Sequence, residues 1–260
     1  EYMRNSVIFL FICIQIFVGC SAPPETGRIV SLSMEVLNPT TDGISVVSFE
    51  IHPTELNLQE KLQQFGESIG QEQLQTKLLQ EGIQLRRVSA IDVPAIVASI
   101  GEVLDESYVW HGQILKWRDL HQRRINPNGM LISEQGTQYF IEEGTLSLMS
   151  RSWLIEREDG LHMYLQFLPT WNVHGEKSPI FGKSKRHLRS KVFSELEFET
   201  LLRDDEAIIV AVELRAPELT SGPHDDGPPA VRLGEALLGG PVRRDTVQIL
   251  VIEANIMPRG

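Results

Sequence analysis

The segment from Leu161 to Leu168 alternates apolar and more polar side chains with a period of two residues. Leu161, Met163, Leu165 and Phe167 are its apolar members, and polar or larger side chains stand between them. Successive side chains of a β-strand point to opposite faces of the sheet, so the alternation predicts a strand with one buried face. Further strand candidates lie at 139–141, 152–155, 207–214 and 246–252, with turn-forming residues between them. A β-rich antiparallel module is therefore expected over 102–260.

In the preceding segment, 29–101, the apolar residues follow two different spacings, one typical of strands and one typical of helices. Alternating runs at 29–36 and 44–51 flank a turn-forming stretch and predict a β-hairpin. Helical spacing follows over 55–69, 71–80 and 92–100, where Gly82 would end the second helix and Asp92 would cap the third. The expected fold class is thus α+β: a small N-terminal module of a hairpin and two or three helices, then the β-rich module. An acidic Pro/Gly-rich loop is expected at 217–229.

Residues 1–19 have the pattern of a signal peptide. A run of about thirteen mostly apolar residues, Ser6 to Val18, follows Arg4 and is too short to cross a bilayer comfortably. The Pro-containing stretch after it indicates a tether over 20–28. An ordinary cleaved signal, or a buried apolar segment, is the alternative.

The end of the apolar run, Gly19 followed by Cys20, resembles the lipobox of bacterial lipoproteins. Phe17 departs from that pattern, in which leucine is usual. The resemblance implies lipid attachment at Cys20, which would anchor an exported protein in the membrane. With Ser21 after the cysteine, it implies the periplasmic face of the outer membrane.

Charge and cysteine content narrow the possible chemistry. The formal net charge of -11 makes nucleic-acid binding unfavourable at long range. Cys13 and Cys20 are the two cysteines of the chain, so the sequence after residue 20 has no thiol nucleophile, disulfide or cysteine-ligated metal site. Serine-hydrolase, zinc-protease and phosphate-loop motifs are absent as well. No catalytic residue, metal or cofactor is expected, and a non-enzymatic protein is favoured.

One basic stripe stands against this acidic background. Every second residue from 183 to 191 is basic or titratable, so an extended chain would align these side chains on one face. The candidates for contact with an anionic surface are Lys183, Lys185, Arg186, Arg189 and Lys191. The alternative is an exposed loop or edge strand whose lysines oppose aggregation.

Three segments in the C-terminal half resemble the secretin domain of type II and type III secretion channels. They are 201–210, an acidic turn and apolar strand; 233–239, a Leu-Gly stretch; and 248–259, a closing strand that ends in Pro-Arg. Leu237 replaces the proline of the secretin pattern. The resemblance implies a secretin-like β module and only weakly a channel.

Together these features predict a non-enzymatic lipoprotein of the cell envelope that works as a structural or interaction component of an envelope or secretion assembly. Its partners would be the membrane, through the lipid on Cys20, and another protein or a further copy of itself. Two alternatives stay open: an envelope hydrolase of glycans or peptides with carboxylates that the sequence does not identify, and a binding lipoprotein for an anionic surface.

Overall fold

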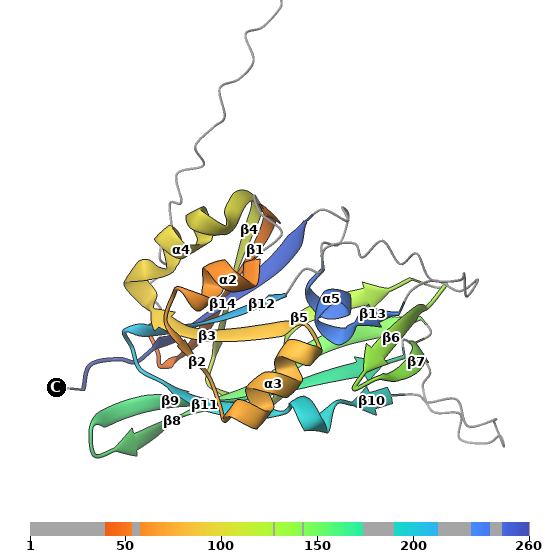
Figure 1. Cartoon of the computed structure of the whole chain (residues 1–260). Helices are drawn as coiled ribbons and strands as arrows, with labels where there is room; N and C mark the ends of the chain where they lie inside the picture. Colours follow the sequence, from red (N-terminus) through yellow and green to blue (C-terminus); the bar gives the residue numbers. More distant parts are fainter. Residues whose placement is uncertain are drawn as a thin grey trace, which may run out of the picture. The chain divides into compact units, whose positions relative to one another are not determined.

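The computed structural model describes residues 40–53, 58–126, 128–141, 143–173, 190–212, 230–239 and 246–259 (Figure 1). Over these residues the protein is predominantly β, with fourteen strands in three sheets and four short α-helices. The signal peptide, the tether, the first strand of the expected hairpin and the 217–229 loop lie outside the described residues.

The largest sheet, sheet A, has six antiparallel strands in the order β2-β3-β12-β14-β1-β4. Their bounds are β1 (Gly43–Pro53), β2 (Glu67–Ser68), β3 (Ile83–Ser89), β4 (Gly101–Gly112), β12 (Glu206–Val212) and β14 (Val247–Asn255). The central strands β12 and β14 consist mainly of aliphatic residues that are buried on both faces of the sheet, so they form the hydrophobic core of the molecule.

The second sheet, sheet B, is built on a long hairpin. Strands β8 (Gly144–Arg157) and β9 (Gly160–Asn172) pair along their whole length, and Gly160 takes a positive φ of 127° in the turn. On the far side of β8 lies β5 (Ile114–Ile125), and on the far side of β9 lie β10 (Ser190–Val192) and β11 (Phe198–Leu202).

A small third sheet and the helices complete the fold. Sheet C contains β6 (Met130–Glu134), β7 (Thr137–Ile141) and β13 (Val231–Arg232). The α-helices are α2 (Leu58–Gln63), α3 (Glu72–Gln80), α4 (Val93–Ile100) and α5 (Leu233–Leu238), and two 3₁₀ turns are η2 (Ala90–Asp92) and η3 (Ser194–Leu196). Helix α2 contacts α4, and α5 contacts strands of all three sheets (Figure 1).

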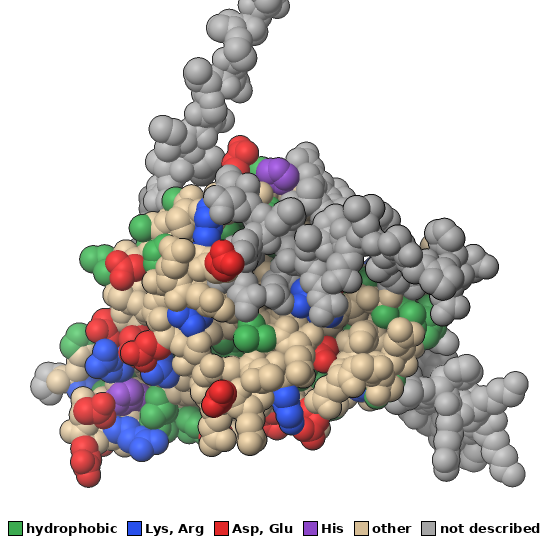
Figure 2. All heavy atoms as spheres, viewed as in Figure 1, with side chains coloured by type: hydrophobic (Ala, Val, Ile, Leu, Met, Phe, Trp, Pro, Cys, Tyr) green, Lys and Arg blue, Asp and Glu red, His purple; other side chains and the backbone are tan. Residues whose placement is uncertain are grey.

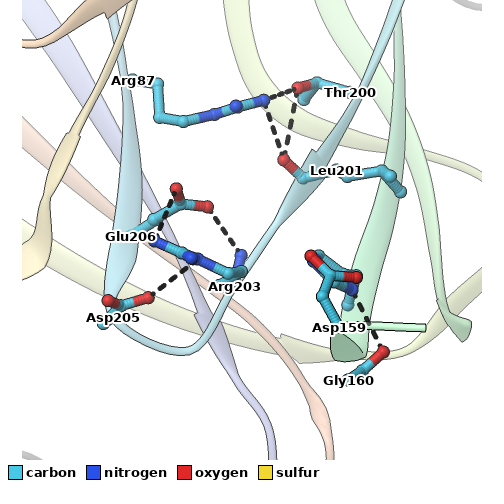
Figure 3. A network of polar contacts seen from close by, with 9 residues as sticks. Arg87, Asp159, Gly160, Thr200, Leu201, Arg203, Asp205 and Glu206 are labelled. Atoms are coloured by element: carbon cyan, nitrogen blue, oxygen red, sulfur yellow. Dashed lines mark hydrogen bonds and ion pairs between the residues drawn. The ribbon is translucent and has the colours of Figure 1, made fainter. Parts of the chain in front are cut away.

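One arginine joins sheets A and B. The Nη2 atom of Arg87, on β3, donates hydrogen bonds to the hydroxyl of Thr200 at 2.7 Å and to the carbonyl oxygen of Leu201 at 3.0 Å, both on β11 (Figure 3). Close by, Arg203 pairs with Asp205 and Glu206 in the turn between β11 and β12. The turn is thereby held where the chain leaves sheet B and enters sheet A.

The prediction of an α+β fold with a separate helix-containing N-terminal module is wrong. Strand β1 pairs with β4 and with β14, and β3 pairs with β12, so strands from both ends of the chain form one sheet. The physical reason lies in β1 itself, which is buried on both faces and therefore needs a neighbouring strand on each edge. The four described helices are short, and each lies between two strands along the chain.

Several local predictions are confirmed. The strands expected at 139–141, 152–155, 161–168, 207–214 and 246–252 correspond to β7, β8, β9, β12 and β14. Helix α3 ends before Gly82, whose φ is 74°. Asp92 stands at the predicted N-cap position of α4, but the expected cap is wrong, since its side chain makes no cap hydrogen bond there.

Candidate interaction site at two open strand edges

The anionic-contact residues predicted from sequence are placed only in part. Lys183, Lys185, Arg186 and Arg189 lie outside the described residues, as does Cys20. Lys191 is on β10, where its ammonium pairs with the Glu134 carboxylate and lies 3.2 Å from the centre of the Tyr139 ring. Its side chain is only 18% exposed. Lys191 therefore holds β10 against sheet C, and its charge is already paired.

The described part of the chain has neither a helix suited to cross a membrane nor a cluster of metal ligands. None of its helices is both long and apolar enough to span a bilayer. No three of its histidine, cysteine or acidic side chains gather closely enough to bind a metal ion.

Strand β4 is an open edge. It is the last strand of sheet A and pairs with β1 alone, so the backbone groups along its other side have no strand partner among the described residues. None of its twelve residues is buried, and the large apolar side chains of Leu104, Tyr108 and Val109 are 41%, 38% and 48% exposed. A long exposed edge with apolar side chains is a template for pairing with another strand.

Gly43, which begins β1, and Gly101, which begins β4, let these two strands approach closely. A Cβ on Gly43 would lie 2.3 Å from the Cα of Gly112, and one on Gly101 would lie 2.3 Å from the carbonyl oxygen of His52. The close approach fixes the position of β4, so its outer edge is presented in one place.

Strand β5 is an edge of sheet B, since it pairs with β8 alone among the described strands, and it follows β4 at once. Gly112, with a φ of 65°, and Gln113 make the change from one sheet to the other. The Gln113 side chain accepts a hydrogen bond from the backbone nitrogen of Leu154 on β8, which anchors the bend. Leu115, just after the bend, is 72% exposed. One continuous segment, 101–125, thus supplies an open edge to each sheet.

The two edges carry opposite charges. Strand β4 contains three acids and no lysine or arginine, whereas β5 contains four bases and one acid. The acids of β4 are Glu102, Asp105 and Glu106, and the bases of β5 are Lys116, Arg118, Arg123 and Arg124. On the face shown in Figure 2, by contrast, acidic and basic side chains are interspersed.

Most of these charges are unpaired within the described structure. The three acids of β4 have no ion-pair partner there, and neither do Lys116 and Arg118. Arg124 lies 3.4 Å from the Glu143 carboxylate, and Arg123 donates to the carbonyl oxygen of Glu235 at 2.8 Å. Burial raises the pKa of Glu106, so a nearby positive charge would favour its ionised form.

An open groove of about 640 Å³ lies at the bend between the two strands. It is lined by Val109 and His111 from β4 and by Trp117, Arg118 and His121 from β5, among others. The Nε2 atom of His121 donates to the carbonyl oxygen of Leu237 at 3.1 Å, and burial lowers the pKa of this histidine. Burial, and then the charge of Arg118, lower the pKa of His111. Both imidazoles therefore favour the neutral form and add no positive charge to the groove.

Sequence reasoning predicted β structure in this region but missed the open edges. One sequence feature could have indicated these edges. Within a single strand-like stretch, acidic residues at 102–106 are followed by basic residues at 116–124. Interleaving of tryptophan with basic residues, Lys116-Trp117-Arg118 and Arg151-Ser152-Trp153, was visible too.

Comparison of the chain with protein-family models, curated proteins and solved structures finds no match. The secretin and lipoprotein resemblances accordingly stay predictions.

Proposed function

We propose that this protein is a non-enzymatic structural or interaction component of a cell-envelope assembly, and that its copies associate by pairing β4 of one with β5 of another. The observation that supports the pairing is the placement of two open, oppositely charged strand edges on one continuous segment. Export and anchoring through Cys20 belong to the same proposal and are supported by the N-terminal sequence pattern. Labelling by palmitate in a Gram-negative host, lost in Cys20→Ala, tests the anchor.

Charge decides which edges pair. If β4 paired antiparallel along its length with β4 of a second copy, the three acids would face uncharged residues of the other half, so no opposite charges would meet. Antiparallel pairing of two copies about Gln113 sets each acidic half against a basic half, and it does so twice because the two copies are equivalent. Each opposite-charge pair across strands contributes roughly 0.2–1 kcal/mol, in addition to the backbone hydrogen bonds that close the edges. The contact is self-complementary and closes as a two-fold dimer.

Charge reversal tests this pairing. One variant carries Glu102→Lys, Asp105→Lys and Glu106→Lys, and the other carries Lys116→Glu, Arg118→Glu and Arg124→Glu. In sedimentation-velocity measurements the wild type is expected to be a dimer, and each variant alone a monomer. An equimolar mixture of the two variants should recover the dimer, because each acidic edge then meets a basic one.

Circular dichroism and thermal unfolding of each variant serve as the folding control. A wild type that stays monomeric throughout the micromolar range contradicts self-pairing. If both variants remain dimers, the dimer contact lies outside β4 and β5. If the equimolar mixture stays monomeric, charge does not determine which edges pair.

A further inference from the structure

Sheet B carries a cluster of aromatic rings around one arginine on its outer face. The guanidinium of Arg151, on β8, lies 5.0 Å from the ring centre of Trp117 on β5 and 5.6 Å from that of Trp153. The Trp153 ring in turn contacts Tyr164 of β9, with ring centres 4.6 Å apart and the planes inclined by 44°. All four side chains are half-buried. We call these four residues the aromatic face.

A line of hydrogen bonds continues the aromatic face across the sheet. The Nε atom of Arg151 donates to the amide oxygen of Gln166, and the amide nitrogen of Gln166 donates to the Glu199 carboxylate at 3.2 Å. The Tyr164 hydroxyl donates to the same carboxylate. The hydrogen bond from Tyr164 lowers the pKa of Glu199, which therefore stays ionised and acts as an acceptor.

The strand registers place all these side chains on the same side of the sheet. Arg151 is opposite Gln166, Trp153 is opposite Tyr164, and Gln166 is opposite Glu199. The residues between them on β8 and β9, including Ser150, Ser152, Leu165 and Phe167, are buried on the other side. The aromatic face is thus the solvent side of a sheet whose other side is core.

This face has both hydrogen-bond donors and hydrogen-bond acceptors that have no partner among the described residues. No described residue accepts a hydrogen bond from the Nη atoms of Arg151, and one carboxylate oxygen of Glu199 has no donor. Asp119 adds a second carboxylate, since it is in register with Met149, two residues before Arg151 on the same side. Arg157 lies further along the same side of β8, so the face carries two cations and two carboxylates and has no excess of positive charge. This disfavours a polyanion or an anionic membrane as the ligand.

We infer that the aromatic face binds a neutral polysaccharide, whose sugar rings lie on Trp117, Trp153 and Tyr164 while their hydroxyls bond to Arg151, Gln166 and Glu199. Aromatic rings offer apolar area at low entropic cost, and hydroxyls need both donors and acceptors, which this face supplies side by side. From β5 to β11 there are three inter-strand steps, about 14 Å, so several sugar rings can be accommodated across the strands.

This site is independent of the proposed strand pairing. Edge pairing uses the backbone groups of β4 and β5, whereas the glycan contacts side chains that project from the face of sheet B. Each can therefore fail without the other.

Affinity electrophoresis of the full chain tests the inference, in gels that contain a neutral glucan, mannan, xylan or galactan, or the carboxylated polymer polygalacturonate. At least one neutral polysaccharide should retard the wild type. Trp117→Ala and Trp153→Ala are each expected to weaken that binding at least tenfold. Trp110→Ala is the matched control, because Trp110 lies on β4 outside the aromatic face, and it should bind as the wild type does.

Glu199→Gln gives a readout that does not depend on removing a ring. It keeps the shape of an exposed side chain but loses the charged acceptor, and a several-fold weaker retardation is expected. Migration of the wild type unretarded in every neutral gel overturns the inference, as does retardation by polygalacturonate alone. Equal weakening by Trp110→Ala, or none by the Trp117 and Trp153 variants, also overturns it, since the rings would then serve only to stabilise the sheet.

Discussion

Replacement of Phe167 by alanine is expected to lower the free energy of unfolding by about 3–5 kcal/mol, the usual cost of emptying a buried aromatic site. The Phe167 side chain has no exposed surface. It lies on β9 between Ser150 of β8 and Phe198 of β11, and its ring stacks on that of Phe198 with centres 4.6 Å apart and planes inclined by 18°. Both strands that flank β9 would lose contacts, so the cavity has little chance to collapse.

Urea denaturation followed by circular dichroism measures this loss, and Phe140→Ala is its control. Phe140 is also a phenylalanine on a strand, β7, but it is 62% exposed, so its removal should change the free energy of unfolding by no more than about 0.5 kcal/mol. Similar losses in the two variants would show that the interior of sheet B does not depend on the Phe167 ring.

The position of Phe167 was predictable because the relevant pattern is local. The two-residue alternation over 161–168 fixes which side chains share a face, whatever strands lie beside them. The same holds for α3, where apolar spacing and Gly82 mark the helix and its end. Periodicity therefore predicted most individual elements of the fold.

Pairing between strands was not predictable in this way. The alternation of β1 suggested a hairpin with the segment before it, yet its described partners are β4 and β14, and β14 is close to the other end of the sequence. A strand that is buried on both faces has no polar side to indicate its neighbours. The fold class was therefore wrong even though its local elements were found.

The two candidate sites failed to emerge from sequence for a related reason. The openness of β4 and β5 is the absence of a second strand neighbour among the described residues, which no local pattern records. Trp117 and Arg151 meet because β5 pairs with β8, although they are far apart along the chain. The sequence pattern pointed instead to the basic stripe at 183–191. Of its five candidate residues, Lys191 alone lies among the described residues, and it pairs with Glu134.

Replacement of Glu81 by glutamine is expected to stabilise the protein by about 1–3 kcal/mol near neutral pH, because the amide keeps the shape of the side chain but removes a buried negative charge, whose desolvation is costly. The residue is 2% exposed and directly follows α3. One carboxylate oxygen accepts a hydrogen bond from the backbone nitrogen of Gln135 at 2.7 Å, and the other has no hydrogen-bond partner. Burial raises the pKa of Glu81 and the Glu134 carboxylate adds to the effect, while the Gln135 hydrogen bond, the backbone nitrogen of Leu233 and the charge of Arg232 oppose it.

The sign of the pH dependence follows from this raised pKa. Below about pH 4 the carboxyl is protonated in the folded and the unfolded chain, so it does not distinguish wild type from Glu81→Gln. As the pH rises towards the raised pKa, the unfolded chain ionises first, and the wild type loses stability that the neutral glutamine retains. The variant's advantage should therefore grow with pH from about 4 and level off above the raised pKa. Urea denaturation of both proteins between pH 4 and 8 measures it, with exposed Glu158→Gln as the control, and parallel pH profiles for wild type and Glu81→Gln would contradict a strained buried carboxyl.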